Sequence, residues 1–361
     1  MTQTPEGRLT IAQRFNAGRR RPRRDRVPEG RLIPRERWPN SVVPPALQLF
    51  TIRNPASELA GYCRWSLRDR LGLMTHIVRG VIPRVTQTSR PDSRFSSVRA
   101  ILFTLMNLSL NSKVALITGG SRGIGAAAVR MFAAAGAKVV FNYQSAKAQA
   151  EDLVRECGAA NCRAVQSDLS TTAAAQQLVV AAIAAFGRLD IMVANHGIWP
   201  PEDAPIDRMP DEQWHRTIAV NLDSVFALVK HSVAQMKKQG GTPAGHIVLV
   251  SSTAGQRGEA FHCDYAASKG ALISMVKGLS TELAQDRIYV NCVAPGWVAT
   301  DMSADALSDP PTRAKIFDSI PMGRVGTPEE IAAPILFLCT PHAGFITGEV
   351  FNVNGGAVLT G

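Results

Sequence analysis

Tyr265 and Lys269 stand four residues apart in the stretch DYAASK, a spacing that places both side chains on one face of a helix. A free tyrosine has a pKa near ~10 and exchanges protons poorly at neutral pH. A neighbouring ammonium stabilises the phenolate, so we expect Lys269 to lower the pKa of Tyr265. Ser252 closes the apolar run HIVLVSS and can offer its hydroxyl to a substrate oxygen. These residues predict a site that moves a proton on and off an alcohol or ketone oxygen, although the Tyr–Lys pair alone also fits a surface contact.

A glycine-rich turn precedes this site in the chain. Residues 114–117 are apolar and partly β-branched, as in a central parallel strand, and Gly119, Gly123 and Gly125 follow before a helix over 126–135. Glycines let the backbone approach a pyrophosphate, and the helix N-terminus offers free N–H groups. The spacing G-x-x-x-G-x-G is a variant of the dinucleotide fingerprint. We predict a nucleotide site, with an ordinary strand-to-helix turn as the alternative.

The end of the next strand bears on which nucleotide binds. An acidic residue there would bind the ribose 2′-hydroxyl of NAD, but the strand over 137–143 ends in Asn142 and Tyr143. Arg122 lies inside the glycine turn, within reach of a 2′-phosphate. We therefore favour NADP(H) over NAD(H). The alternative for Arg122 is a solvated loop side chain.

Two further strands are expected to end at the same edge of the sheet. Asp168 follows a strand over 163–166 and is placed either to cap a helix or to meet an adenine ring. Asn195, His196 and Gly197 follow a strand over 189–194, where polar residues face the ligand crevice. For His196 we favour a structural or solvated role over a catalytic one.

These features together resemble the short-chain dehydrogenase/reductase family. The resemblance runs from about Met106 to the C-terminus, 256 residues. One departure is the run ANHG (194–197), where the family usually has N-N-A-G. The motifs that carry the resemblance are TGGSRGIG (118–125), Asp168, ANHG, Asn221, Ser252, YAASK (265–269), Pro295-Gly296 and VNGG (353–356).

The resemblance implies a role for each matching residue. Tyr265 would be the general acid/base, Lys269 would lower its pKa and bind the nicotinamide ribose, Ser252 would hold the substrate carbonyl, and Asn221 would hold a water in the proton relay. The residues implied to line the cofactor are Gly119, Ser121, Arg122, Gly123, Ile124, Gly125, Asn142, Tyr143, Asp168, Leu169, Asn195, Gly197, Tyr265, Lys269, Pro295, Gly296, Val298 and Thr300.

The alternation of strand and helix patterns predicts a single α/β domain over 106–361, a Rossmann-type doubly wound parallel sheet. An apolar helix is expected over 265–284, with strands over 287–293 and 348–353. Thr327, Pro328 and Glu330 predict a helix start with a capping box. The resemblance also implies a homotetramer, with helices around 215–239 and 265–285 between subunits.

The first 105 residues differ in composition from the rest of the chain. They hold 20 arginines, no lysine and seven acidic residues, a net charge of +13. The remainder holds 20 basic and 22 acidic residues, a net charge of −2, which does not indicate a polyanionic partner. With ten prolines and no periodicity, the extension is expected to be disordered.

We hypothesise that residues 1–105 are translated upstream sequence and that the protein begins at Met106, with a transit-type targeting peptide as the alternative. The apolar stretch 98–108 is too short to span a bilayer. No nucleic-acid or membrane partner is therefore expected, although DNA binding by the arginine-rich extension is a competing interpretation. Six scattered cysteines without a C-x-x-C pair indicate a reducing, cytoplasmic location and no metal site.

Substrate choice is expected to lie in two stretches, 198–205 and 301–321, the second a lid interrupted at Asp309-Pro310-Pro311 and carrying a helix over 312–317. The overall pattern is most similar to bacterial 3-oxoacyl-[acyl-carrier-protein] reductases, which implies an acyl-carrier-bound or small carbonyl substrate. Sugar, steroid and other secondary-alcohol dehydrogenases of the family, and a non-catalytic nucleotide-binding scaffold, are the alternatives. Candidate apolar walls are Trp199, Phe261, Trp297 and Met302, and candidates for a basic rim are Lys237, Lys238 and Arg257.

Overall fold

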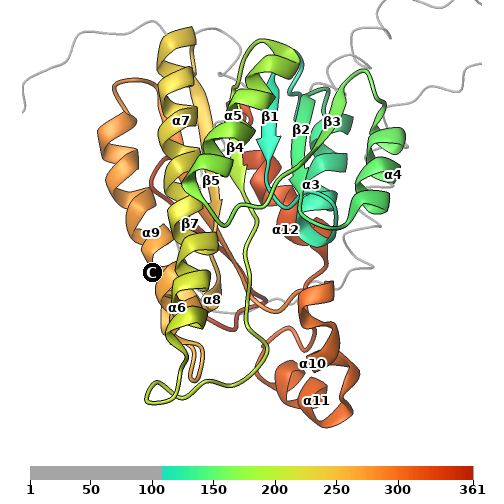
Figure 1. The fold of residues 1–361 in the computed structure, drawn as a ribbon, viewed down its shortest axis with the longest axis vertical. Helices are drawn as coiled ribbons and strands as arrows, with labels where there is room; N and C mark the ends of the chain where they lie inside the picture. Colours follow the sequence, from blue (N-terminus) through green and yellow to red (C-terminus); the bar gives the residue numbers. More distant parts are fainter. Residues whose placement is uncertain (1–107, 361) are drawn as a thin grey trace, which may run out of the picture. The chain divides into compact units, whose positions relative to one another are not determined.

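Seven parallel strands form the sheet that carries the site, in the order β3-β2-β1-β4-β5-β6-β7 (Figure 1). The computed structural model describes residues 108–360. The strands are β1 (Val114–Ile117), β2 (Lys138–Tyr143), β3 (Cys162–Gln166), β4 (Ile191–Ala194), β5 (Gly245–Val250), β6 (Ile288–Pro295) and β7 (Val350–Val353).

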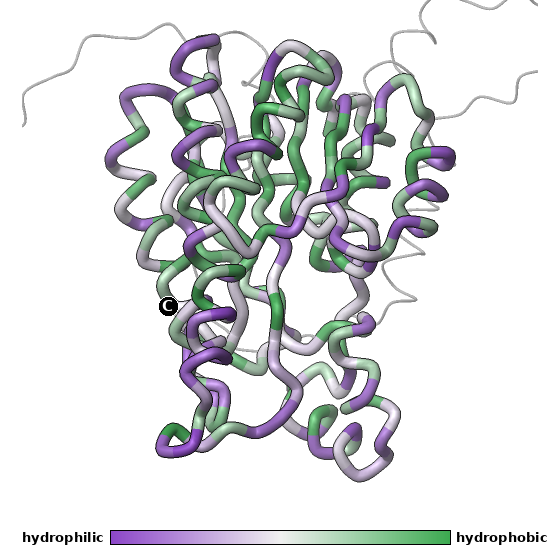
Figure 2. The backbone as a smooth tube through the Cα atoms, viewed as in Figure 1, coloured by the Kyte–Doolittle hydropathy of each residue, from purple (hydrophilic) through white to green (hydrophobic). Residues whose placement is uncertain are grey.

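Helices cover both faces of this sheet. One hydrophobic cluster joins α3 (Gly123–Ala134), α4 (Lys147–Cys157) and α12 (Pro328–Leu338) to one face. A second cluster joins α5 (Thr172–Phe186), α7 (Ser224–Gln239) and α9 (Cys263–Leu283) to the other face. Figure 2 shows hydrophobic residues concentrated on the strands between the two helical layers.

Alternate residues of each strand belong to alternate clusters. In β1, Ala115 and Ile117 pack under α3 while Leu116 packs with the opposite layer, as the two-residue period of a strand requires. Because both faces are covered, the central strands β1 and β4 are apolar throughout, which is the pattern that predicted a central parallel sheet. The predicted Rossmann-type doubly wound fold is confirmed for the described residues.

The order of the strands creates a crevice. β1 pairs with β2 on one side and with β4 on the other, so the connections that leave these strands diverge to opposite faces. Ligands of open α/β sheets bind at the carboxyl ends of the strands beside such a switch point. The remaining elements lie around this edge: α6 (Asp211–Ile218), a π-helical turn (Ala219–Asp223), α8 (Thr253–Arg257), α10 (Ala304–Ser308) and α11 (Pro310–Asp318).

Local signals placed most element boundaries within two or three residues. The predicted capping box is confirmed: Thr327 Oγ1 accepts from the Glu330 amide at 3.3 Å, and Glu330 accepts from the Thr327 amide at 2.9 Å. The predicted interruption at Asp309 separates α10 (Ala304–Ser308) from α11 (Pro310–Asp318), and Asp309 caps α11, accepting from the Thr312 amide at 3.0 Å. The expectations for residues 1–105 lie outside the described residues. Within residues 108–360, no helix has the length and apolarity needed to cross a membrane.

One buried histidine makes a prediction about acid stability. His246 in β5 is 4% exposed, and burial, with the nearby Lys113, lowers its pKa to about 4. The unfolded chain binds this proton near pH ~6.5, so the free energy of unfolding should decrease as the pH falls from ~6.5 toward about 4. Urea unfolding at a series of pH values in this range gives the slope of the free energy of unfolding against pH. This slope should be smaller in His246→Gln than in the wild type by on the order of 1 kcal/mol per pH unit. An unchanged slope would mean that His246 is not held neutral in the folded protein.

Candidate active site

A cavity of about 570 Å³ opens at the carboxyl ends of the strands. Its walls come from the glycine turn and from the segments that follow β2, β3, β4, β5 and β6, together with the start of α9. Eighteen of the twenty residues predicted to act in catalysis or cofactor binding line it: Gly119, Ser121, Arg122, Gly123, Ile124, Asn142, Tyr143, Asp168, Leu169, Asn195, Gly197, Ser252, Tyr265, Lys269, Pro295, Gly296, Val298 and Thr300. Gly125 and Asn221 stand outside the wall.

The glycine turn is held open by two side-chain amides. Asn142 is buried; its Oδ1 accepts from the Gly119 amide at 2.8 Å and its Nδ2 donates to the Ser167 carbonyl at 3.1 Å. Asn195 Nδ2 donates to the carbonyls of Thr118 at 3.0 Å and Gly119 at 3.3 Å. Gly119 has φ +63°, a conformation that favours glycine. Asn142 therefore shapes the turn from inside and does not stand free for a ribose.

The first turn of α3 suits an anion. No side chain caps this helix and no acidic residue lies in its first turn, so its N–H groups and the positive end of its dipole face the cavity unopposed. Gly125, missing from the wall, packs the helix against the turn, because a Cβ there would overlap the Gly119 carbonyl oxygen. The turn therefore fits the pyrophosphate of a dinucleotide, as the sequence predicted.

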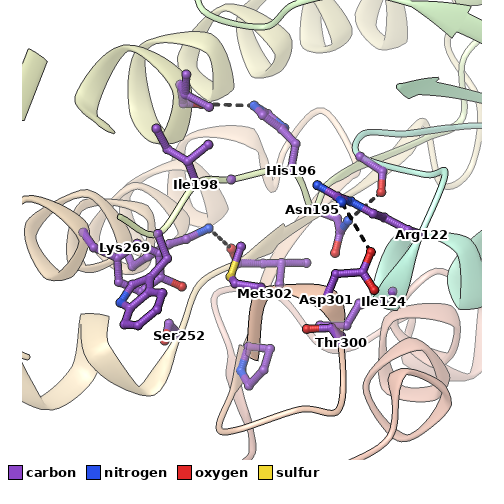
Figure 3. A pocket seen from close by; sticks show the side chains of 18 of the residues that line it. Arg122, Ile124, Asn195, His196, Ile198, Ser252, Lys269, Thr300, Asp301 and Met302 are labelled. Carbon is purple, nitrogen blue, oxygen red and sulfur yellow. Dashed lines mark hydrogen bonds and ion pairs between the residues drawn. The ribbon is translucent and has the colours of Figure 1, made fainter. Parts of the chain in front are cut away.

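Arg122 spans the mouth of the cavity (Figure 3). Its Nη1 lies 3.3 Å from Asp301 Oδ2, in the segment after β6, and both side chains are well exposed. The segments that supply them are 179 residues apart in the chain. An exposed pair of this kind contributes little to stability, so it leaves Arg122 available to a stronger anionic ligand.

The proton-handling residues meet on the opposite wall. Tyr265 and Lys269 lie one turn apart in α9, and Ser252, at the end of β5, is the N-cap of α8, accepting from the Ala254 amide at 3.1 Å. The Ser252 hydroxyl neighbours the Tyr265 phenol and lowers the pKa of that phenol. Lys269 is 4% exposed, and its Nζ donates to the Val250 carbonyl at 3.0 Å. The hydroxyl, the phenol and the ammonium thus gather at one end of the cavity.

The expectation that Lys269 lowers the pKa of Tyr265 is wrong for the structure. Burial raises the pKa of Tyr265 to about 12 and outweighs the effect of the neighbouring Ser252 side chain, which lowers that pKa. Lys269 Nζ lies 5.8 Å from the centroid of the phenol ring and is bound to Val250, so it does not offset the burial. Burial lowers the pKa of Lys269 itself to about 8. In the structure Tyr265 is therefore a protonated phenol, which can donate its proton.

Asn221 stands behind the wall. It is fully buried in the π-helical turn; its Oδ1 accepts from the Ile198 amide at 2.8 Å, and its Nδ2 donates to the Ile198 carbonyl at 2.9 Å and to Ser268 Oγ at 3.2 Å. Both ends of this carboxamide are thus bound to protein. Gly197 lies between the side chains of Asn221 and Lys269. A Cβ at this position would be 3.1 Å from Lys269 Nζ and 3.2 Å from Asn221 Oδ1.

His196 has the structural role favoured from the sequence, with partners that the sequence did not indicate. Its Nδ1 lies 2.7 Å from Thr118 Oγ1, and its Nε2 lies 2.7 Å from Ser224 Oγ and 3.1 Å from the Val220 carbonyl oxygen (Figure 3). Burial, with the charge of Lys269, lowers the pKa of His196 to about 3, so the ring is neutral.

Three expectations are corrected. Asp168 does not cap α5, because Thr171 does so, accepting from the Ala174 amide at 3.2 Å; Asp168 instead accepts from the Ser170 amide and lines the cavity. Phe261 lines a separate hollow and is half exposed. Of the proposed basic rim, only Arg257 lines the cavity, since Lys237 lies at the end of α7 and pairs with Asp286 at 2.6 Å.

Several lining residues were missed in the sequence. Gln144, Ser145 and Ala146 continue the chain past the end of β2, and the rule that loops after parallel strands face the crevice would have found them. Arg216 in α6 and Glu259 after α8 carried no such signal, since they reach the cavity only through the packing of those helices.

Comparison with known proteins agrees with this arrangement. A family model described as "Enoyl-(Acyl carrier protein) reductase" matches residues 119–358, more than half of the chain. A 3-oxoacyl-[acyl-carrier-protein] reductase of Synechocystis sp. is 39% identical over 254 residues, which is 70% of this chain and 99% of the relative.

Two solved structures share the fold. A 3-ketoacyl-(acyl-carrier-protein) reductase from Brucella melitensis, complexed with NADH, has 35% identity and a TM-score of 0.64, covering 70% of this chain and 100% of its own. A blue fluorescent protein from a metagenomic library, in complex with NADPH, has 34% identity and a TM-score of 0.64 over the same shares. The chain belongs to the short-chain dehydrogenase/reductase family and is an NAD(P)-dependent oxidoreductase.

Proposed function

We propose that this enzyme interconverts a 3-oxoacyl thioester and its 3-hydroxy form, at a site composed of Ser252, Tyr265 and Lys269. One observation carries the proposal: a hydroxyl, a protonated phenol and a buried ammonium lie in one cavity with a glycine turn suited to a dinucleotide. A structural scaffold would not require these three groups to converge at the cavity wall.

The residues divide the work as follows. The chemistry that the nucleotide supplies when bound is hydride transfer to the carbonyl carbon. The glycine turn and the first turn of α3 hold the phosphates, while Asn195 and the segment from Pro295 to Thr300 line the same cavity. Ser252 orients the substrate oxygen, and Tyr265 donates a proton to it. Lys269, buried on the same wall, would bind the ribose of the nucleotide.

Asn221 has a positioning role in this proposal. Its carboxamide fixes the backbone of Ile198, and so the loop that runs past Lys269. A relay water would be held by this loop and the π-helical turn together.

The cavity wall favours an acyl chain. Trp199, Trp297 and Met302 line the cavity and supply apolar surface, and Arg216 and Arg257 line it as well. An apolar wall with nearby cations suits a substrate that combines an acyl chain with an anionic carrier arm. The relative named as a 3-oxoacyl-[acyl-carrier-protein] reductase supports the same substrate class.

The test is consumption of NADPH by the purified chain with acetoacetyl-CoA as the thioester substrate. Turnover with the thioester, together with at least ~10-fold lower kcat/KM for sugar and steroid ketones, is the expected result. Preferred turnover of a sugar or steroid ketone would overturn the substrate class while leaving the reaction class intact.

We also propose that NADP(H) is preferred over NAD(H). The segment after β2 has no acidic residue between Asn142 and Ala146, and Arg122 faces the same cavity with only an exposed ion pair. The Arg122→Ala change should lower kcat/KM about tenfold for NADPH and much less for NADH, because only the former offers a 2′-phosphate. Arg130→Ala is the control, an exposed arginine of the same helix that pairs with Glu156 at 2.8 Å. Equal losses with both cofactors would contradict this assignment.

We further propose a cytoplasmic homotetramer in which the helices around 215–239 and 265–285 pack between subunits. Phe226 in α7 is 54% exposed, a large apolar side chain that an interface would cover. Sedimentation equilibrium of the intact chain tests the oligomeric state.

A further inference from the structure

His196 connects two segments that border the proton-handling end of the cavity. It belongs to the loop after β4, and its ring reaches Val220 in the π-helical turn and Ser224 at the start of α7. Asn221, inside that turn, reaches back to the backbone of Ile198 in the same loop. The loop and the turn are therefore linked in both directions, each by one side chain bound to the other's backbone.

The protons in this network can be assigned from its chemistry. A carbonyl oxygen only accepts, so the Nε2 beside the Val220 carbonyl carries the hydrogen and Nδ1 is the acceptor. Thr118 Oγ1 accepts from the amides of Asn195 at 3.0 Å and His196 at 3.2 Å. Its hydrogen has two acceptors within reach, Nδ1 at 2.7 Å and the Val193 carbonyl at 3.3 Å, and the shorter contact supplies the donor that an unprotonated Nδ1 requires. Ser224 Oγ accepts from Nε2 and donates to the Val220 carbonyl at 2.7 Å. Every group is satisfied by a single neutral tautomer.

The location of this network relates it to catalysis. A π-helical turn leaves the regular i→i−4 ladder, so its geometry depends on contacts from outside the helix. The turn carries Asn221, and the linked loop carries Gly197, whose backbone lies close against Lys269 Nζ and Asn221 Oδ1. A shift of the turn would thus move Asn221, and it would also move Gly197, which lies against the Lys269 side chain.

We propose that His196 is a positioning residue that locks the π-helical turn of residues 219–223 against the loop after β4 and so fixes the placement of Asn221 and Lys269. This inference rests on the proposed function for its kinetic consequence, but not for its structural one. Only the contacts of Nε2 hold the π-helical turn against the loop. Nδ1 contacts Thr118, which follows β1.

Two substitutions separate the two sides of the ring. Asn at position 196 keeps an acceptor where Nδ1 stands but has no donor for Val220, whereas Gln keeps a donor near the position of Nε2 but has no acceptor for Thr118. His196→Asn loses the two contacts of Nε2, with Val220 and Ser224, and His196→Gln loses the contact of Nδ1 with Thr118. The melting temperatures of both variants are therefore measured to show any difference in general destabilisation.

The experiment compares His196→Asn with His196→Gln in the intact chain. We expect His196→Asn to lower kcat for acetoacetyl-CoA reduction roughly tenfold, because the contacts of Nε2 with the turn are lost, and His196→Gln to remain within about threefold of the wild type. The dissociation constant of NADPH, measured by fluorescence titration, should change less than about threefold in both. The same kcat in the two variants would overturn the proposal, as would a loss confined to His196→Gln.

A second readout does not depend on turnover. Hydrogen–deuterium exchange of the segment 217–228 should be faster in His196→Asn than in His196→Gln, at similar melting temperatures. If no carbonyl substrate is turned over, the proposed function fails, yet this exchange difference still tests the lock. Equal exchange in the two variants would overturn it even where the enzyme is active.

Discussion

Tyr265→Phe should lower carbonyl reduction by roughly 10²–10⁴-fold, the usual contribution of general acid–base catalysis. The phenol is the group on the cavity wall that neighbours the Ser252 hydroxyl and is held protonated by its burial, with a pKa raised to about 12. Removing one oxygen leaves the ring in place, so the fold and the nucleotide cavity should be unaffected. Steady-state kinetics with NADPH and acetoacetyl-CoA provide the measurement.

Tyr289→Phe is the matched control for this change. Tyr289 lies in β6, where its ring meets His246 edge to face at a centroid distance of 5.5 Å, and it does not line the cavity. Its turnover should remain close to that of the wild type. If Tyr265→Phe were as active as this control, proton donation would have to come from another group, and the assignment of Tyr265 would be wrong.

Gly125→Ala should abolish measurable nucleotide binding. A Cβ at this position would overlap the Gly119 carbonyl oxygen and lie 2.8 Å from Asn195 Nδ2, and the first contact is with backbone that cannot rotate away. The start of α3 would have to move from the glycine turn, and its N–H groups would no longer face the phosphates. We expect the dissociation constant of NADPH to increase by at least ~100-fold, measured by fluorescence titration.

Gly278→Ala provides the control for a glycine-to-alanine change. Gly278 lies in α9, and nothing stands within 4 Å of the position where its Cβ would be. Because alanine is the better helix former by roughly 0.5–1 kcal/mol, this variant should be as stable as the wild type or slightly more so, with unchanged NADPH binding. Tight binding in Gly125→Ala, by contrast, would show that the glycine turn does not hold the nucleotide.

The sequence by itself determined the order of the elements and most of the predicted residues that line the cavity. Strand and helix periods, glycine positions and the Thr327 capping box are local signals, because they depend on residues only a few positions apart. For the same reason the pairing of Tyr265 with Lys269 on one helical face was predicted correctly, as was the position of Ser252 at a strand end.

Only the tertiary structure decided which of these residues line the cavity and how their pKa values are shifted. Asn221 lies behind the wall because the π-helical turn directs its carboxamide to Ile198, and the pKa of Tyr265 is raised because burial outweighs an ammonium that is bound elsewhere. Arg122 meets Asp301 across 179 residues, and His196 meets Thr118 across 78. Such contacts and the desolvation that accompanies them are set by the packing of distant segments, on which local periodicity carries no information.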